Sequence, residues 1–554
     1  MNETNFIKLY ESSFRENWDL KAFTDLSEST SLTYGDFAKE VARLHILFEL
    51  MGINKKDKIA LIGNNHTVWA SVFMAAITYG AVIVPVLHDF HPDSMENIIL
   101  HSDAKIIFID PKLWEKLNSE KFTQPVFTIP SFEMIKGATD ATNNLQKRID
   151  EKFSLKYPDG FKPVDVKYPN IRNESVVCLN YTSGTTGFSK GVMLTGNNYA
   201  GNLVFAKRAN LLFKGEKIVA FLPMAHAYGC AFDFLYSLSV GVHIHLIGKN
   251  ISSPALLDAF RKVKPKLIFT VPLILEKIYQ KRIQPIINKP TFKALLKVPF
   301  LKRVVYAKIH KTLVTAFGGN FREIIVGGAA LSKEAEDFLY KIKFPFSVGY
   351  GMTECAPLIS FDSHKDFIQT SCGTILEGIM KARIDSDYPR TSPGEIQVKG
   401  QNVMEGYYKN PEATAAAFTE DGWMRTGDLG VLDHNNRLFI KGRIKTMILG
   451  ANGQNIYPEE IEARLNNMPY IAESLVIKRR NRLVGLVYPD YYEMDENGVT
   501  IDQLTDIMNA NRLEVNQHLA MFEQIGYIEL RKEEFEKTPK RSIKRFLYVE
   551  ENNV

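Results

Sequence analysis

Cysteine is scarce in this chain, and the few cysteines lie far apart. Only four occur among 554 residues, and no two of them form a CxxC pair. This spacing argues against a disulfide framework and against a zinc site. The four positions are Cys178, Cys230, Cys355 and Cys372. The N-terminal segment also lacks the apolar core of a secretory signal, so the expected location is the reducing cytoplasm.

A large excess of one charge is also missing. The 68 Lys and Arg residues exceed the 63 Asp and Glu residues by a formal charge of +5, which is too small over this length to indicate a nucleic-acid-binding protein. The charge is unevenly spread, because residues 445–554 hold 14 basic and 18 acidic side chains. Sequence repeats and low-complexity tracts are absent, which leaves an ordinary globular protein.

Charged residues are absent between residues 59 and 87. An uncharged apolar run of this length resembles a membrane span. We interpret it instead as a buried strand, helix and strand, at residues 59–63, 69–79 and 81–86, with Gly80 ending the helix. Three polar residues are expected to cap that helix: Asn64, Asn65 and Thr67.

Short apolar runs alternate with helical stretches through most of the chain, as in α/β proteins. The runs are residues 106–109, 218–222, 267–271 and 324–326. The last hundred or so residues differ and predict a compact α+β unit. Its expected elements are helices at 459–466 and 501–519 and strands at 473–478, 483–488 and 525–531.

A strongly basic segment covers residues 277–322, with eleven Lys or Arg residues and no acid. One interpretation is a solvated helical face. The other is attraction to an anionic lipid surface, because apolar residues alternate with the basic ones. They are Phe292, Leu295, Leu296, Val298, Phe300, Leu301, Val304, Val305 and Tyr306.

The strongest chemical signal is the segment LNYTSGTTGFSKGV at residues 179–192. An apolar strand leads into a loop whose glycines allow backbone N–H groups to approach a phosphate closely, and whose hydroxyls add donors. Lys190 adds a positive charge. The loop residues are Thr182, Ser183, Gly184, Thr185, Thr186 and Gly187. The spacing is not that of a Walker A loop, so a P-loop NTPase is excluded.

This segment resembles the phosphate loop of the adenylate-forming enzymes, the superfamily of acyl-CoA synthetases, peptide-synthetase adenylation domains and luciferases. Further motifs follow in the order of that family, and the resemblance extends from about residue 32 to about residue 548. They are AFLPMAHAYG (220–229), VGGAAL (326–331), VGYGMTE (348–354), GEIQVKG (394–400), VMEGYYKNP (403–411), WMRTGDLG (423–430), IKGRIK (440–445) and NIYPEEIE (455–462).

The resemblance implies roles for individual residues. Catalytic roles fall on Lys190, Thr353 and Glu354, and contacts with Mg²⁺ on Glu354 and Thr185. Besides the phosphate loop, the nucleotide contacts are expected from Gly328, Ala329, Tyr350, Gly351, Asp428 and Arg443. The acyl pocket is expected at His226, Tyr228 and Gly327.

Simple chemistry supports several of these roles. Glu354 offers the hard oxygen that Mg²⁺ prefers. Asp428 can accept ribose hydroxyls, and Arg443 can donate to phosphate or ribose oxygens. The aromatic face of Tyr350 suits adenine, with core packing as the alternative. For His226 the alternative is an ordinary wall residue.

The implied fold is α/β, with a large N-terminal domain of mixed and parallel sheets with flanking helices (1–444) and a small mobile α+β domain (445–554). Lys445 occupies the hinge position. The implied reaction uses ATP and Mg²⁺ to convert a carboxylic acid into acyl-AMP and pyrophosphate. Coenzyme A then takes the acyl group. The absence of GxSxG and HExxH motifs agrees with a reaction that needs no side-chain nucleophile.

The chain departs from the family near its C-terminus. The position expected to hold a catalytic lysine is Ser542. We therefore hypothesise that Lys540 or Lys544 substitutes. The departure also keeps open a catalytically impaired homologue that binds nucleotide or acyl groups.

The segment VPLILEKIY (271–279) resembles long-chain acyl-CoA synthetases. A long-chain fatty acid is therefore the expected substrate, with medium-chain and aryl acids as alternatives. A carrier-protein thiol is the alternative acceptor to coenzyme A. The expected partners are thus a fatty acid, ATP and coenzyme A, without nucleic acid and with peripheral contact with the inner face of the membrane.

Overall fold

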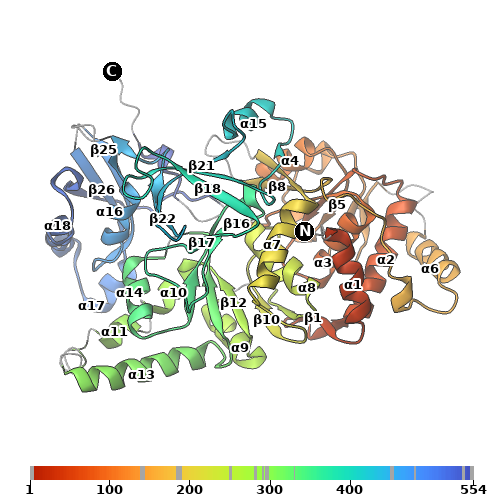
Figure 1. Ribbon diagram of the computed structural model, residues 1–554, viewed down its shortest axis with the longest axis horizontal. Coiled ribbons are helices and arrows are strands. Elements are labelled where there is room, and N and C mark those ends of the chain that lie inside the picture. Colours follow the sequence, from red (N-terminus) through yellow and green to blue (C-terminus); the bar gives the residue numbers. More distant parts are fainter. Residues whose placement is uncertain are drawn as a thin grey trace.

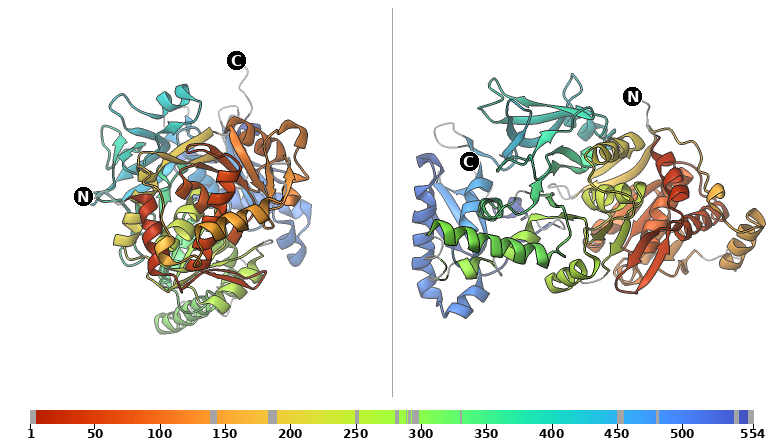
Figure 2. Two further views of the ribbon diagram at one scale, coloured as in Figure 1. Left: turned by 90° about the vertical axis from the view of Figure 1, so that its right-hand side faces the viewer. Right: turned by 60° about the horizontal axis from the view of Figure 1, so that its bottom comes forward.

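The computed structural model describes residues 5–137, 144–182, 190–248, 252–279, 283–287, 289, 292, 298–329, 331–449, 455–479, 482–538 and 543–549. The N-terminal sheets and helices make up the larger part of the molecule, and the C-terminal elements form a smaller part at one end (Figures 1 and 2). The α/β fold with a small C-terminal α+β part confirms the fold predicted from the sequence.

The largest sheet has eight strands in the order β20-β9-β8-β4-β3-β5-β6-β7. Strands β3, β4, β5, β6 and β8 are parallel to their neighbours within that run, whereas β7, β9 and β20 are antiparallel to theirs. The strands are β3 (Lys58–Ile62), β4 (Val82–Val86), β5 (Ala104–Ile109), β6 (Val126–Thr128), β7 (Met134–Lys136), β8 (Val176–Thr182), β9 (Lys190–Thr195) and β20 (Gly406–Tyr407).

The uncharged stretch at residues 59–87 forms β3, helix α3 (Thr67–Tyr79) and β4, as predicted. Nearly all of α3 is buried, and Gly80 ends it with a φ of 95°. The helix cap differs from the prediction: its N-cap is His66, whose side chain accepts the N–H of Val68. Among the described residues, no helix is long and apolar enough to cross a membrane.

Four smaller sheets complete the N-terminal part: β10-β11-β1-β2, β12-β13-β14, β15-β16-β17 and β18-β19-β21-β22. Their strands are β1 (Lys21–Asp25), β2 (Thr30–Thr33), β10 (Lys217–Ala220), β11 (His243–Leu246), β12 (Leu267–Thr270), β13 (Glu323–Val326), β14 (Phe346–Val348), β15 (Tyr350–Gly351), β16 (Leu358–Phe361), β17 (Thr374–Ile375), β18 (Met380–Asp385), β19 (Gly394–Gly400), β21 (Met424–Leu432) and β22 (Leu438–Arg443). The three strands β12, β13 and β14 are parallel, which brings their carboxyl ends to one edge.

Helices cover these sheets (Figure 1). They are α1 (Phe6–Glu16), α2 (Tyr34–Leu50), α4 (Pro92–His101), α5 (Pro111–Trp114), α6 (Leu145–Lys156), α7 (Gly196–Arg208), α8 (Ser237–Ser239), α9 (Ser253–Val263), α10 (Pro272–Ile278), α11 (Gln284–Ile287), α13 (Pro299–Ala316), α14 (Lys333–Lys341) and α15 (Pro411–Ala417). A π-helical turn, η4 (Gly229–Tyr236), precedes α8.

The C-terminal part contains every element predicted for it. These are α16 (Pro458–Leu465), β25 (Ile471–Arg479), β26 (Arg482–Pro489), α18 (Ile501–Gln517) and β27 (Ile525–Leu530), together with β23 (Ile448–Leu449), β24 (Asn455–Ile456) and α17 (Tyr491–Asn497). One cluster of buried apolar side chains extends from Phe6 to Leu438. Separate clusters lie between Ile456 and Phe535. The two parts therefore have their own cores, with the predicted hinge residue between them in the sequence.

Candidate active site

The site is built at the carboxyl ends of β13 and β14. Gly327, Gly328 and Ala329 follow β13, and Tyr350 comes two residues after β14. The N–H of Gly349 donates to the carbonyl of Val326 over 2.9 Å, which holds the two connections together. Such a strand edge is the usual ligand position in open α/β sheets.

The residues predicted for the acyl pocket meet at the same edge. The hydroxyl of Tyr228 donates to the carbonyl of Ile325 over 3.0 Å. A Cβ added to Gly327 would lie 3.0 Å from the Tyr228 ring, so glycine allows this close approach. The Nδ1 atom of His226 accepts the N–H of Tyr228 over 3.3 Å. The structure thus brings His226, Tyr228 and Gly327 together, next to Gly328, whose φ of 86° suits glycine.

Tyr350, Asp428 and Arg443 form a second group. The Tyr350 hydroxyl donates to Oδ2 of Asp428 over 2.5 Å, and Nε of Arg443 lies 3.0 Å from Oδ1. Asp428 and Arg443 face each other in the β21–β22 ladder. Burial raises the pKa of Asp428, and the charge of Arg443 opposes that rise. Burial, followed by the charge of Asp428, raises the pKa of Tyr350, so its hydroxyl stays a donor.

Lys190 and Glu354 are connected through a tyrosine. The ammonium of Lys190 lies 4.7 Å from the centre of the Tyr407 ring. The hydroxyl of the same ring donates to Oε1 of Glu354 over 2.9 Å. Glu354 belongs to the short 3-10 helix η6 (Thr353–Cys355), whose three residues are all buried. Its carbonyl also accepts the N–H of Met404 over 2.7 Å. These contacts hold the acidic side chain close to the start of β9.

The two ends of the predicted phosphate loop lie opposite each other. Thr182 ends β8 and Lys190 begins β9, and the two are paired in the antiparallel ladder. Ser183, Gly184, Thr185, Thr186 and Gly187 lie outside the described residues. Gly351 packs closely against the backbone of Pro357, and a Cβ at this position would lie 2.3 Å from the Pro357 carbonyl oxygen.

Of the candidate residues near the C-terminus, the structure describes Lys445 and Lys544. Lys445 is exposed in the turn that follows β22. Lys544 donates to Oε2 of Glu536 over 3.1 Å, within its own segment. Lys540 and Ser542 lie outside the described residues.

Two residues near this site had no predicted role. Tyr407 was noted only within the VMEGYYKNP motif, and its contacts depend on strand pairing that the sequence does not reveal.

Asp233 lies fully buried in the π-helical turn η4. Burial raises the pKa of Asp233 well above its ordinary value, and an interaction with the backbone of Leu222 opposes that rise. The sequence has no signature that separates a buried aspartate from an exposed one.

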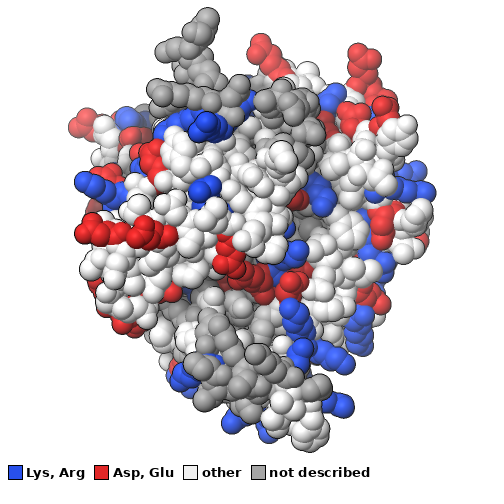
Figure 3. All heavy atoms as spheres, turned by 90° about the vertical axis from the view of Figure 1, so that its left-hand side faces the viewer, with Lys and Arg blue, Asp and Glu red and all other residues white. Residues whose placement is uncertain are grey.

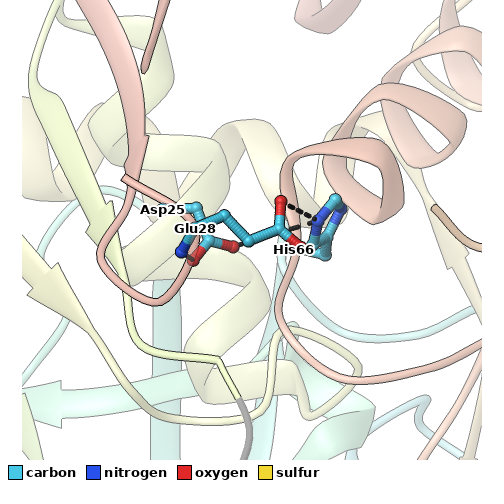
Figure 4. A group of neighbouring side chains, drawn as sticks. All are labelled: Asp25, Glu28 and His66. Carbon is cyan, nitrogen blue, oxygen red and sulfur yellow. Dashed lines mark hydrogen bonds and ion pairs between the residues drawn. The ribbon is translucent and has the colours of Figure 1, made fainter. Parts of the chain in front are cut away.

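Figure 4 shows a different group of side chains, Asp25, Glu28 and His66, whose ligand-type atoms lie within 4.8 Å of one another. Nε2 of His66 is 3.3 Å from Glu28 and 3.9 Å from Asp25. Its Nδ1, however, accepts the N–H of Val68 over 3.1 Å. The ring proton therefore sits on Nε2 and faces the carboxylates, where a metal would need a lone pair. The group joins the turn after β1 to the start of α3 by hydrogen bonding.

The chain belongs to the AMP-binding enzyme family, whose model matches residues 10–408. This places it among the adenylate-forming enzymes, as the sequence motifs predicted.

Among curated proteins, it is 28% identical over 496 residues to a 4-coumarate:CoA ligase of Petunia hybrida, covering 86% of this chain and 82% of that protein. It is 26% identical over 485 residues to a long-chain-fatty-acid–CoA ligase of Mycobacterium bovis, covering 82% of this chain and 76% of the relative.

Solved structures share the fold. ATP-bound MatB from Rhodopseudomonas palustris matches with a TM-score of 0.75 at 21% identity, over 98% of both chains. The o-succinylbenzoate CoA synthetase MenE from Bacillus subtilis, in complex with its acyl-adenylate intermediate, matches with a TM-score of 0.73 at 19% identity, over 99% of this chain and 98% of that one.

Proposed function

We propose that the protein is an ATP-dependent acid–thiol ligase that activates a fatty acid as acyl-AMP and then transfers the acyl group to coenzyme A. The observation that carries the proposal is that the segment from β15 to η6 contributes a residue to each of two charged groups, Tyr350 beside Asp428 and Arg443, and Glu354 linked through Tyr407 to Lys190. Lys190 and Glu354 are suited to the phosphates, and Asp428 to the ribose. Of the acyl-pocket candidates, Gly327 follows β13, and Tyr228, which comes after β10, packs against it.

The proposed chemistry has two steps. A carboxylate oxygen of the acid attacks the α-phosphorus of ATP, and the bond from that phosphorus to the bridging oxygen breaks to release pyrophosphate. The thiol sulfur of coenzyme A then attacks the acyl carbon, and the bond to AMP breaks. AMP makes a far better leaving group than oxide. Lys190 would stabilise the charge on the phosphates, and catalysis would depend on position and electrostatics.

Glu354 fits a magnesium ion. Its carboxylate is buried, is held by one neutral hydroxyl, and supplies the hard oxygen that Mg²⁺ prefers. The predicted second ligand, Thr185, lies outside the described residues. When bound, the ion would neutralise phosphate charge, while Glu354 would orient it.

The acid is proposed to be a long-chain fatty acid, on the resemblance of residues 271–279 to long-chain acyl-CoA synthetases and on the fatty-acid ligase among the relatives. The 4-coumarate ligase among the relatives supports an aryl acid as the second candidate. The test is AMP release from ATP with coenzyme A across a panel of fatty acids of increasing length and of 4-coumarate. Turnover of 4-coumarate alone would overturn the fatty-acid assignment.

The same assay with a phosphopantetheinylated carrier protein in place of coenzyme A tests the alternative acceptor. Absence of pyrophosphate exchange with every acid would favour the catalytically impaired homologue.

For the C-terminal lysine we propose that Lys540 or Lys544 acts in adenylation. Lys544 would first have to break its hydrogen bond with Glu536. Pyrophosphate exchange that survives both Lys540→Ala and Lys544→Ala would contradict this. A faster Ser542→Lys variant would show that position 542 is impaired.

We also propose that α13 contacts an anionic membrane surface. Phe300 is 75% and Val304 is 53% exposed on this helix. Lys302, Lys308 and Lys311 are exposed beside them. In Figure 3 the lower edge of the molecule, where α13 lies, carries mostly basic side chains among the coloured ones. Apolar side chains that insert and basic ones that bind lipid headgroups are the two requirements for such contact.

Vesicle sedimentation tests this contact. The protein is expected to sediment with vesicles that contain phosphatidylglycerol and to stay in solution with pure phosphatidylcholine. Lys308→Ser with Lys311→Ser should weaken binding about tenfold or more. Tyr388→Ser, which alters a 70% exposed aromatic residue elsewhere, is the matched control. Equal sedimentation of the double variant and the control would contradict the contact.

A further inference from the structure

The backbone around Tyr407 is held firmly in place. Strand β20 pairs with β9, and Tyr407 lies opposite Val192, two residues from Lys190. The N–H of Tyr407 also donates to Oγ1 of Thr414 over 2.9 Å. The preceding Gly406 has no room for a side chain, because a Cβ there would lie 2.7 Å from Thr414. The ring of Tyr407 therefore leaves the sheet at a defined point.

From this point the side chain contacts both charged groups of the phosphate side. Its ring face meets the Lys190 ammonium at 4.7 Å. Its hydroxyl donates to Glu354 at 2.9 Å. Lys190 and Glu354, which are both described, form no ion pair with each other. The tyrosine contacts both a half-buried cation and a buried anion, which attract each other more strongly there than they would in open water.

A direct ion pair would impair both groups. The ammonium would direct N–H donors at the carboxylate, and its positive charge would offset the negative charge that attracts a metal ion. The tyrosine avoids both effects. Its ring attracts Lys190 through the quadrupole and leaves the N–H donors free. Its hydroxyl bonds Glu354 as a neutral donor and leaves the negative charge in place.

We propose that Tyr407 is a positioning residue that keeps Lys190 and Glu354 apart, so that the lysine remains available to a phosphate and the glutamate to a divalent cation. The inference rests on the proposed function for the identity of those ligands. The separation itself can be tested without turnover. It extends the site by a residue that acts through Lys190 and Glu354.

The first test measures Lys190 in the protein without ligands. The rate of its acetylation by acetic anhydride is followed by mass spectrometry. In Tyr407→Leu the lysine can pair with Glu354, and its labelling is expected to slow about tenfold. In Tyr407→Leu combined with Glu354→Gln there is no carboxylate to pair with, and the wild-type rate should return. A merely structural role for Tyr407 would not produce this recovery.

The second test measures Mg²⁺ dependence of ATP binding by calorimetry. Tyr407→Phe keeps the ring and removes the donor to Glu354, and should raise the half-saturating Mg²⁺ concentration about tenfold. Binding of ATP without Mg²⁺ should change less than this. The control is Tyr408→Phe, whose hydroxyl donates to Asp103 over 2.9 Å, outside the site. Thermal unfolding should be similar for Tyr407→Phe, Tyr408→Phe and wild type.

The outcomes separate the two proposals. Wild-type labelling of Lys190 in Tyr407→Leu overturns the positioning role, whatever the enzyme's activity. A labelling rate that stays low in the double variant also overturns it. If labelling and Mg²⁺ dependence change as expected while no acid supports pyrophosphate exchange, the positioning role stands and the proposed reaction falls.

Discussion

The site contains two groups centred on a tyrosine, and they differ in whether the cation and the carboxylate pair directly with each other. On the ribose side, Tyr350 donates to Asp428, and Arg443 pairs directly with the same carboxylate. On the phosphate side, Tyr407 donates to Glu354, but the cation lies against the tyrosine ring. In the first group a cation and an anion neutralise each other, and in the second they do not.

This difference matches what each group is proposed to bind. Ribose hydroxyls are neutral and need an oriented acceptor, so the paired carboxylate of Asp428 suffices. Phosphate and Mg²⁺ are charged and need charged partners, which a direct Lys190–Glu354 ion pair would not provide. The following predictions test whether the two groups really differ.

The largest effect is expected for the phosphate-side carboxylate. Glu354→Gln keeps the size and a hydrogen-bond acceptor and removes the charge. We expect it to slow pyrophosphate exchange at saturating ATP by about a hundredfold to a thousandfold. Asp428→Asn should act chiefly by raising KM for ATP. Equal losses of maximal rate in the two variants would abolish the distinction.

A smaller effect is expected for the ribose-side tyrosine. Tyr350→Phe removes a hydrogen bond to a charged group and should raise KM for ATP about tenfold. Unlike Tyr407→Phe, it should leave the Mg²⁺ requirement of ATP binding unchanged. Steady-state kinetics at several Mg²⁺ concentrations check this. A shift of the Mg²⁺ requirement in Tyr350→Phe would show that the groups are coupled.

The stability of the ribose side should depend on pH in a particular direction. Burial raises the pKa of Asp428, so the folded state holds this proton at higher pH than the unfolded state does. The wild-type protein therefore loses stability as pH rises from the unfolded-state pKa to the folded-state pKa. Asp428→Asn cannot ionise, and its unfolding midpoint relative to wild type should rise from about pH 4 upward and then level off. Midpoints without nucleotide, across pH, check this. A constant difference would contradict it.

The smallest effect is expected outside the site, at the His66 group. His66→Ala removes the helix cap and should destabilise the protein by about 1 kcal/mol, whereas His66→Asn can cap α3 and should cost less. Both variants should keep the ATP affinity of the wild type. Denaturant unfolding and ATP calorimetry measure the two quantities. Added Zn²⁺ should not raise the unfolding midpoint of the wild type, since Nε2 carries the proton.

Apolar patterns predicted the elements of this fold well. The stretch at residues 59–87 and the strands of the C-terminal part were found because burial leaves a regular pattern in short runs. The cap at His66 was missed because histidine is not a typical N-cap residue, and its use here depends on Asp25 and Glu28 nearby.

The site was predicted less completely. Lys190, Glu354, Asp428 and Arg443 stand in recognisable motifs, and their roles stay predictions. Tyr407 carried no signal of its own, since its partners are set by the pairing of β20 with β9 across more than two hundred residues. A tyrosine in the core and a tyrosine between two charges look the same in a sequence.

The contact between Tyr228 and Gly327 has a consequence for engineering. One residue belongs to the proposed acyl wall and the other to the turn beside the nucleotide, and they touch without space for a methyl group. A substitution of Gly327 must therefore displace the Tyr228 ring, and so alter the acyl wall from the nucleotide side. Acid selectivity and ATP affinity are expected to change together in libraries that vary this position. Independent tuning of the acid will have to come from wall residues further from β13.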